Sequence, residues 1–140
     1  MAISNALNTA LSGAQAASQR FGVSAENVAN LRSVANSSTD PNRETTDAEG
    51  RTLFNPTRAV DQTTASGGVR STRQLVDPSA VQQYDPTASD ANADGIVNRP
   101  NVSIEQEVVS QISAQRQFEA NLATIKAADE LAESTLDILG

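Results

Sequence analysis

The sequence lacks cysteine, histidine and tryptophan, and its 140 residues include only one tyrosine and three phenylalanines. Without cysteine and histidine there is no thiolate nucleophile, no usual general base and no common zinc ligand set. Positive charge is also scarce, with ten Lys and Arg residues against seventeen Asp and Glu, and Lys126 is the only lysine. No basic cluster is dense enough to follow a phosphate backbone, so the sequence predicts no nucleic-acid partner.

Long apolar runs are missing as well. No stretch reaches the length of a membrane-spanning helix, so no membrane span is expected. The first residues have neither a basic segment nor a continuous apolar core, which predicts that no signal peptide is cleaved. The net charge of −7 and the small number of large apolar side chains favour incomplete burial over a compact core.

The last third of the chain, residues 103–139, contains neither Pro nor Gly and repeats apolar residues every seven positions. One row of this repeat is Ile104, Gln111, Phe118, Ile125, Ala132 and Leu139, and the other is Val108, Gln115, Leu122, Asp129 and Leu136. Eight of these eleven positions are apolar, which is typical of a helix that packs along another helix.

The ends of this helix are marked by Ser103, which forms a capping box with Gln106, and by Gly140. At about 1.5 Å per residue the helix reaches roughly 54 Å. The rest of the chain is too short to wrap a helix of this length. Its apolar rows therefore need a partner helix, in this chain or in another.

A second helix is predicted from Ser4 to about Leu31. Its apolar repeat runs through Leu7, Ala14, Phe21 and Val28, with Leu11, Ser18 and Ala25 four residues after the first three. Gly13 and Gly22 weaken it by about 1 kcal/mol each relative to Ala. Small residues recur at three- and four-residue steps, which favours close helix packing over mere helix propensity: Ala6, Ala10, Ala14 and Ala17.

Residues 32–102 show no helical period. Residues 33–51 are polar and predict a loop that is mobile in the monomer. Leu53 and Phe54 form an isolated apolar pair, which favours a docking point rather than an independent core. Beyond two glycines, Val69, Ser71, Arg73 and Leu75 share one side of a predicted strand that ends at Pro78. This strand suits a short hairpin with residues 54–60.

One segment resembles a metal site. Asp90, Asn92, Asp94 and Gly95 match the opening of a calcium loop, in which alternate oxygen side chains surround the ion. The twelfth position, however, is Asn101 rather than a bidentate glutamate. We therefore interpret the segment as a turn whose Asp and Asn side chains cap their own backbone, with a calcium site as the alternative.

Catalytic groups are not indicated either. Carboxylates lie close together at Glu105 and Glu107, and again at Glu130 and Glu133, but residues 103–140 hold seven acids and two bases with no apolar pocket to shift a pKa. They are interpreted as a solvated helix face. The sequence predicts no enzyme and no cofactor.

The two ends together resemble the bacterial flagellar rod, hook and hook-associated family. The matching runs are ALNTALSGAQAASQRFGVSAENVANL, with an Asn-x-Ala-Asn signature at residues 27–30, and NVSIEQEVVSQISAQRQFEANLATIKAADEL, with Phe118 and Asn121 as the aromatic-x-x-Asn pair. GGVR, VDPSAVQQYDP and DANADGIVNRPNV in the middle are most similar to a proximal rod subunit. The chain departs from the family after Asn30, where residues 31–36 replace its usual Gly-Tyr turn.

The resemblance implies a mainly α protein with two long terminal helices in an antiparallel, coiled-coil-like pair. Residues 1–31 and 103–140 form the rod core domain, and residues 32–102 an extended segment, partly β or irregular. It implies a structural subunit that is exported by the flagellar type III apparatus and polymerises into the periplasmic rod of the basal body. The implied partners are copies of itself and other rod proteins, with the surrounding rings as a further option.

The residues expected to pack helices in the assembly are Leu7, Leu11, Ala14, Phe21, Asn27, Val28, Asn30, Val108, Phe118, Asn121, Leu122, Ile125 and Leu136. The three asparagines are expected to bond between helices or to the adjoining backbone. Two alternatives remain open, another axial subunit of the same family and a non-flagellar two-helix adaptor. An adaptor would form a discrete oligomer rather than a filament.

Overall fold

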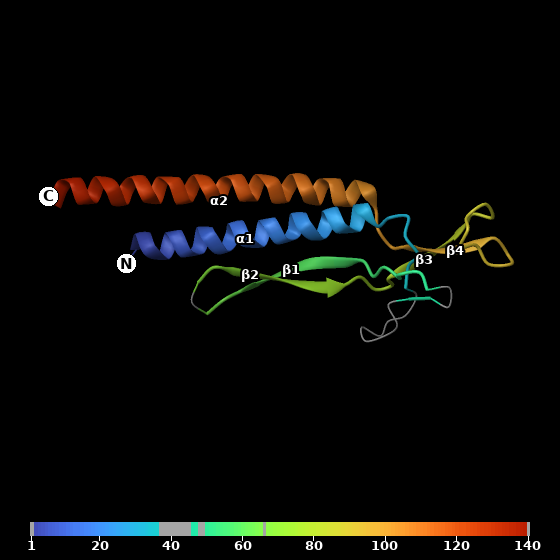
Figure 1. The fold of residues 1–140 in the computed structure, drawn as a ribbon. Coiled ribbons are helices and arrows are strands. Elements are labelled where there is room, and N and C mark those ends of the chain that lie inside the picture. The colour runs from blue at the N-terminus through green and yellow to red at the C-terminus, as the bar shows by residue number, and fades with distance from the viewer. Residues whose placement is uncertain (1, 37–45, 48–49, 66, 140) are drawn as a thin grey trace. The chain divides into compact units, whose positions relative to one another are not determined.

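The computed structural model describes residues 2–36, 46–47, 50–65 and 67–139. It contains two helices, α1 (Ala2–Ala29) and α2 (Ile104–Leu139), and between them two hairpins (Figure 1). The first hairpin pairs β1 (Thr57–Thr63) with β2 (Val69–Leu75), and the second pairs β3 (Ala80–Tyr84) with β4 (Ile96–Pro100). The fold is therefore mainly α, with a middle of short strands. No helix in the described part of the chain is both long and apolar enough to cross a membrane.

Both predicted helices are present. α2 begins directly after Ser103 and continues to Leu139 as expected, and the Ser103 hydroxyl accepts a long hydrogen bond of 3.4 Å from the Gln106 N–H. α1 ends at Ala29, two residues before the predicted end. The predicted antiparallel pairing would bring Met1 toward Gly140, but both of these residues lie outside the described part of the chain.

The chain divides into two compact units, and each is built from all three predicted segments. Unit 1 comprises Met1–Gly22, Ala59–Thr72 and Val108–Gly140, and unit 2 comprises Val23–Arg58 and Arg73–Glu107. The predicted boundaries at residues 31 and 103 lie close to the ends of the two long helices.

In unit 1, α1 and α2 run antiparallel. Gly13 lies against Asn121, and further along α1 the Arg20 guanidinium donates a hydrogen bond to the Gln117 side chain. The fully buried side chains of this unit are small, which lets the backbones approach closely. They are Ala10, Ala14, Ala16, Ala17, Ala114 and Ala128.

In unit 2, β3 and β4 pair antiparallel, from Ala80 opposite Pro100 to Tyr84 opposite Ile96. On the other side of β4, the Ala35 N–H donates to the Asn98 carbonyl at 3.1 Å. Ala35 also forms a parallel bridge with Phe54. The segment after α1, where the sequence departs from the family pattern, is thus held between β4 and Phe54.

The middle of the chain differs from the sequence predictions in two places. The hairpin expected near residues 54–60 exists, but its first strand is shifted to Thr57–Thr63. The β3–β4 hairpin was not predicted. Of the predicted loop at 33–51, residues 37–45 and 48–49 lie outside the described part of the chain.

Candidate functional site

Asn27 is a buried polar residue of α1 whose side chain bonds to two other elements of unit 2. Its side chain is 2% exposed, and its amide nitrogen donates to the Thr57 carbonyl at 2.8 Å and to Glu107 Oε1 at 2.7 Å. Its amide oxygen accepts from the Thr57 N–H at 3.2 Å. One turn earlier, the Ser24 hydroxyl donates to the Glu107 carbonyl at 3.0 Å. Asn27 therefore joins α1 to β1 and to the first turn of α2.

Asn30 and Asn121 make local bonds instead. The Asn30 amide donates to the Glu26 carbonyl at 2.9 Å and its oxygen accepts from the Ser33 hydroxyl at 3.2 Å, which caps the end of α1. The Asn121 amide donates to the Gln117 carbonyl of its own helix at 2.7 Å. Its side chain nevertheless fills the space beside Gly13, so it takes part in the contact between the helices.

Arg20 links three elements of unit 1 and was missed by the sequence analysis. Its guanidinium forms an ion pair of 2.6 Å with Asp61 of β1, in addition to its bond with Gln117 of α2. A signal was present, because Arg20 is the only charged residue among the first 25. Arginine is rarely buried without a partner, so a single charge in this stretch points to one.

Most of the large side chains in the predicted apolar rows are exposed in the single chain. Phe21 is 44% exposed and Phe118 38% exposed, and Leu136 reaches 70%. Leu11, Val108 and Leu122 are exposed as well, whereas Leu7, Val28 and Ile125 are half-buried and only Ala14 is buried. On α2 the buried residues Ala114 and Ala128 belong to a row that lies three residues, not four, from the Phe118 row. The helix pair thus buries alanines and leaves many large side chains outside.

One apolar groove of unit 1 is formed by these exposed residues. It measures about 310 Å³ and is lined by Ala17, Ser18, Phe21, Ala114, Gln115 and Phe118. Phe21 of α1 and Phe118 of α2 both border it. The groove contains no charged side chain, so it suits an apolar side chain of another protein.

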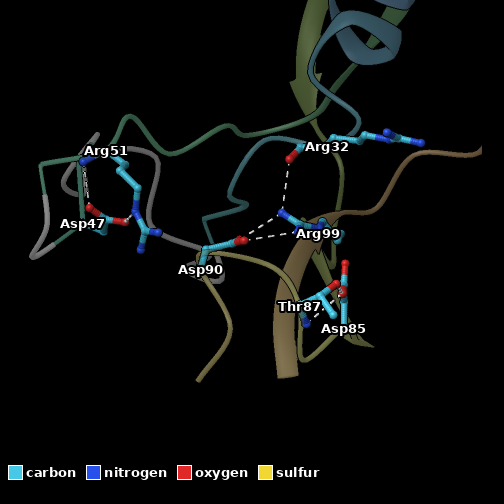
Figure 2. A network of polar contacts seen from close by, with 7 residues as sticks. All are labelled: Arg32, Asp47, Arg51, Asp85, Thr87, Asp90 and Arg99. Atoms are coloured by element: carbon cyan, nitrogen blue, oxygen red, sulfur yellow. Dashed lines mark hydrogen bonds and ion pairs between the residues drawn. The ribbon is translucent and has the colours of Figure 1, made fainter. Parts of the chain in front are cut away.

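A polar network is centred on Arg99 of β4 (Figure 2). The guanidinium donates to both carboxylate oxygens of Asp90, at 2.9 and 3.2 Å, and to the Arg32 carbonyl at 3.1 Å. The Asp90 and Arg99 side chains are largely buried. Paired and hydrogen-bonded in this way, the two charges fasten the β3–β4 turn to the segment after α1.

The segment that matched a calcium loop is the turn between β3 and β4. The Asn92 side-chain oxygen accepts from the backbone N–H groups of Asp94 and Ile96, at 2.9 and 2.8 Å, and Gly95 has a positive φ of 72°. Asp90 forms an ion pair of 2.9 Å with Arg99. The residues behave as the turn interpretation expected, with the asparagine capping its own backbone.

Two carboxyl groups have lowered pKa values. The Thr87 hydroxyl, which donates to Asp85 at 2.8 Å, is the main cause of the low pKa of Asp85 (Figure 2). The backbone N–H of Glu105 itself, followed by the Ser103 hydroxyl, lowers the pKa of Glu105. Glu105 is exposed and Asp85 is half-buried. Both carboxylates are stabilised in the charged form, which is unlike a general acid. Among the described residues no three metal-binding side chains cluster.

Comparison with known proteins identifies similar chains. Residues 93–138 match the family model described as the C-terminal part of flagellar basal body rod FlgEFG proteins. Over 139 residues the chain is 32% identical to the flagellar basal-body rod protein FlgC of Agrobacterium fabrum, covering 98% of this chain and 95% of that protein. It is 33% identical over 139 residues to FlgC of Yersinia enterocolitica, with 99% and 98% covered. For FlgC of Aquifex aeolicus the identity is 32% over 138 residues, with 98% and 97% covered.

Proposed function

Because the chain belongs to the family of the flagellar basal-body rod protein FlgC, we propose that it is a rod subunit that polymerises through its terminal helices. Membership of the family confirms the resemblance predicted from the terminal motifs. The family is structural, so the chain is a structural protein and not an enzyme.

The observation that carries the proposal is the outer surface of α2. This helix of 36 residues exposes eight large apolar side chains, and exposed apolar surface of this kind marks interaction sites. Neighbouring rod subunits are the expected cover for this surface. The exposed residues are Ile104, Val108, Val109, Ile112, Phe118, Leu122, Leu131 and Leu136.

The predicted assembly residues divide into two groups on this view. Those that are exposed in the single chain are assigned to contacts with neighbouring subunits: Leu11, Phe21, Val108, Phe118, Leu122 and Leu136. Those that are buried or half-buried support the coiled-coil-like pairing of α1 with α2 or hold its ends: Leu7, Ala14, Asn27, Val28, Asn30, Asn121 and Ile125. The groove beside Phe21 and Phe118 accepts an apolar side chain of a neighbour.

Repeated contacts of this kind build a filament. A subunit that presents one surface to a different surface of the next copy forms an open helical array unless the rotation closes. Association also stabilises each subunit, because the neighbours bind only its folded state. Stabilisation by neighbours suits this chain, because its buried apolar residues are mostly alanine and few large side chains are buried.

Membership of the family supports a proposal for the location and the export route. We assign the subunit to the periplasmic rod of the basal body, reached through the flagellar type III apparatus. Other rod proteins and the surrounding rings are its proposed neighbours.

The test uses a strain from which the gene for this chain has been deleted. The wild-type chain is expected to support swimming and to be present in purified basal bodies. A chain that accumulates as a discrete soluble oligomer and is missing from basal bodies would favour the adaptor alternative instead.

A further inference from the structure

The groove bordered by Phe21 and Phe118 has room for one large apolar side chain. Ala17 and Ala114 line it and are each 1% exposed, so they form its floor, and the two partly exposed phenylalanines stand beside them. The volume of about 310 Å³ exceeds the cavity of about 150 Å³ that holds a benzene molecule in an apolar protein core. A leucine side chain therefore fits into the groove.

The absence of charge in the groove restricts which part of another copy can bind there. The chain has a net charge of −7, so its copies repel one another. A contact between two copies is therefore favoured where neither surface is charged. The side chain that enters the groove is expected to stand in an uncharged part of its own helix.

Leu131 of α2 meets this requirement. It is 60% exposed, and the residues one helical turn before and after it are small and uncharged. They are Ala127, Ala128, Ser134 and Thr135. A large side chain among small ones projects as a knob, and its small neighbours allow another helix to approach.

The other large side chains that α2 exposes do not meet the requirement. Each of them except Phe118, which already borders the groove, has a charged residue three or four positions away. Glu105, for example, lies four residues before Val109. Leu11 of α1 has uncharged neighbours, but it lies two turns before Ser18 and thus on the side of α1 that lines the groove. Leu131 is the knob that stands on a different surface.

Leu131 cannot enter the groove of its own chain. It stands on the same helix as Phe118, 13 residues further along, which is a distance of roughly 20 Å. At 3.6 residues per turn it also projects about 220° around the helix from Phe118. A contact between this knob and the groove therefore joins two copies.

We propose that Leu131 of one copy inserts into the groove bordered by Phe21 and Phe118 of the next copy. The inference rests on the proposed function, because a filament of copies brings the two surfaces together. Each copy offers one knob and one groove on different sides, so the contact is heterologous and can repeat along a filament. With α2 of both copies parallel, neighbouring copies are displaced by roughly 20 Å along the helix.

The first experiment uses a pair of cysteines, because the chain has none of its own. The variant Ser18→Cys/Leu131→Cys is expressed in the deletion strain, and its purified basal bodies are treated with a mild oxidant. Disulfides between the two positions should give a ladder of dimers, trimers and larger species of this chain. In the matched control Leu136→Cys replaces Leu131→Cys, since Leu136 is also exposed but projects about 140° away around α2.

The outcomes separate this contact from the proposed function. A ladder from the Leu131 pair and not from the Leu136 pair would support the contact. Equal crosslinking of both pairs, or none from either in basal bodies that contain the chain, would overturn the contact and leave the function standing. Absence of the wild-type chain from basal bodies would refute the function and the contact with it.

A second measurement needs no cysteine. Leu131→Gln makes the side chain polar, so the concentration at which the purified chain begins to associate should rise about tenfold or more. Leu131→Met keeps an apolar side chain of similar volume and should change this concentration much less. Position 131 is exposed, so neither variant should alter the helix content of the monomer. Association of Leu131→Gln at the same concentration as the wild type would contradict the contact.

Discussion

The side-chain oxygen of Asn121 lies 2.6 Å from the point where a Cβ on Gly13 would stand. No real Cβ tolerates a neighbour so close, and the Asn121 side chain is short and bonded to the Gln117 carbonyl. Gly13, which looks like a weak point of α1 in the sequence, is thus the residue that admits α2.

Gly13→Ala is therefore expected to destabilise the chain in spite of the higher helix propensity of Ala. The overlap with Asn121 costs about 1–3 kcal/mol, against a gain of about 1 kcal/mol from propensity. Thermal unfolding followed by circular dichroism measures the difference. The double variant Gly13→Ala/Asn121→Ala should be more stable than Gly13→Ala alone, because the space is vacated.

The control for this comparison lies in the same helix. A Cβ at Gly22 meets nothing within 4 Å, so Gly22→Ala is expected to stabilise the chain by about 1 kcal/mol. If Gly13→Ala and Gly22→Ala stabilised it equally, the close contact at Gly13 would not exist in solution.

Asn27→Ala removes the amide that joins Thr57 and Glu107 to α1. Because the groups left behind are partly buried, the free energy of unfolding should fall by about 1–3 kcal/mol. Asn30→Ala is the matched control, since its side chain bonds only near its own helix end, and the expected loss is about 0.5–1 kcal/mol. Urea titration of both variants measures which one loses more free energy of unfolding. A larger loss for Asn30→Ala would argue against the bonds that Asn27 makes to Thr57 and Glu107.

The pKa of Glu105 is lowered by its own backbone N–H and by the Ser103 hydroxyl, which donates to it at 2.8 Å. Ser103→Ala should therefore raise the pKa of Glu105 toward the ordinary glutamate value, as measured by NMR titration of the side-chain carboxyl. The pKa of Asp85, which depends on Thr87, should stay unchanged and serves as the control.

The lowered pKa of Glu105 also determines how its contribution to stability depends on pH. A carboxyl group whose pKa is lowered by folding contributes stability above its unfolded pKa and loses it as the pH falls through the folded value. Glu105 is exposed, so the contribution is small. In Ser103→Ala the difference in stability between neutral and acidic pH should thus be slightly smaller than in the wild type. A larger difference would contradict the assignment of the lowered pKa to the Ser103 hydroxyl.

Phe118→Ala is expected to abolish assembly while expression and export continue. Phe118 is already partly exposed in the single chain, so its removal should change the fold little but take away one border of the groove. The readouts are swimming of the complemented strain and appearance of the chain in the medium. A motile strain that carries Phe118→Ala would exclude this residue from the subunit contacts.

The sequence predicted the helices well and their packing poorly. α2 was bounded correctly because Ser103 caps it and no Pro or Gly interrupts it. The heptad rows selected the largest apolar residues, but the close contact uses Ala114 and Ala128, whose small side chains carry little weight in a search for apolar repeats. Because the small alanines let the two backbones approach closely, α2 turns its alanine row toward α1. Large residues such as Leu122 therefore remain exposed.

The contacts of the middle segment were beyond a single sequence. β3 is exposed at four of its five residues and so shows no alternation that would reveal a strand. Asn27 was singled out by its motif, but its partners Thr57 and Glu107 are 30 and 80 residues away, a distance that no local pattern bridges. For Arg20 the sequence offered a single signal, namely that it is the only charged residue among the first 25.

The most direct test of assembly through the helices is sedimentation velocity on the purified wild-type chain over a series of concentrations, with circular dichroism on the same samples. If the exposed face of α2 is covered by neighbouring copies, the sedimentation coefficient and the helix content should rise together. A fully helical monomer whose sedimentation coefficient does not change with concentration would show that the apolar faces of the helices are already covered within one chain.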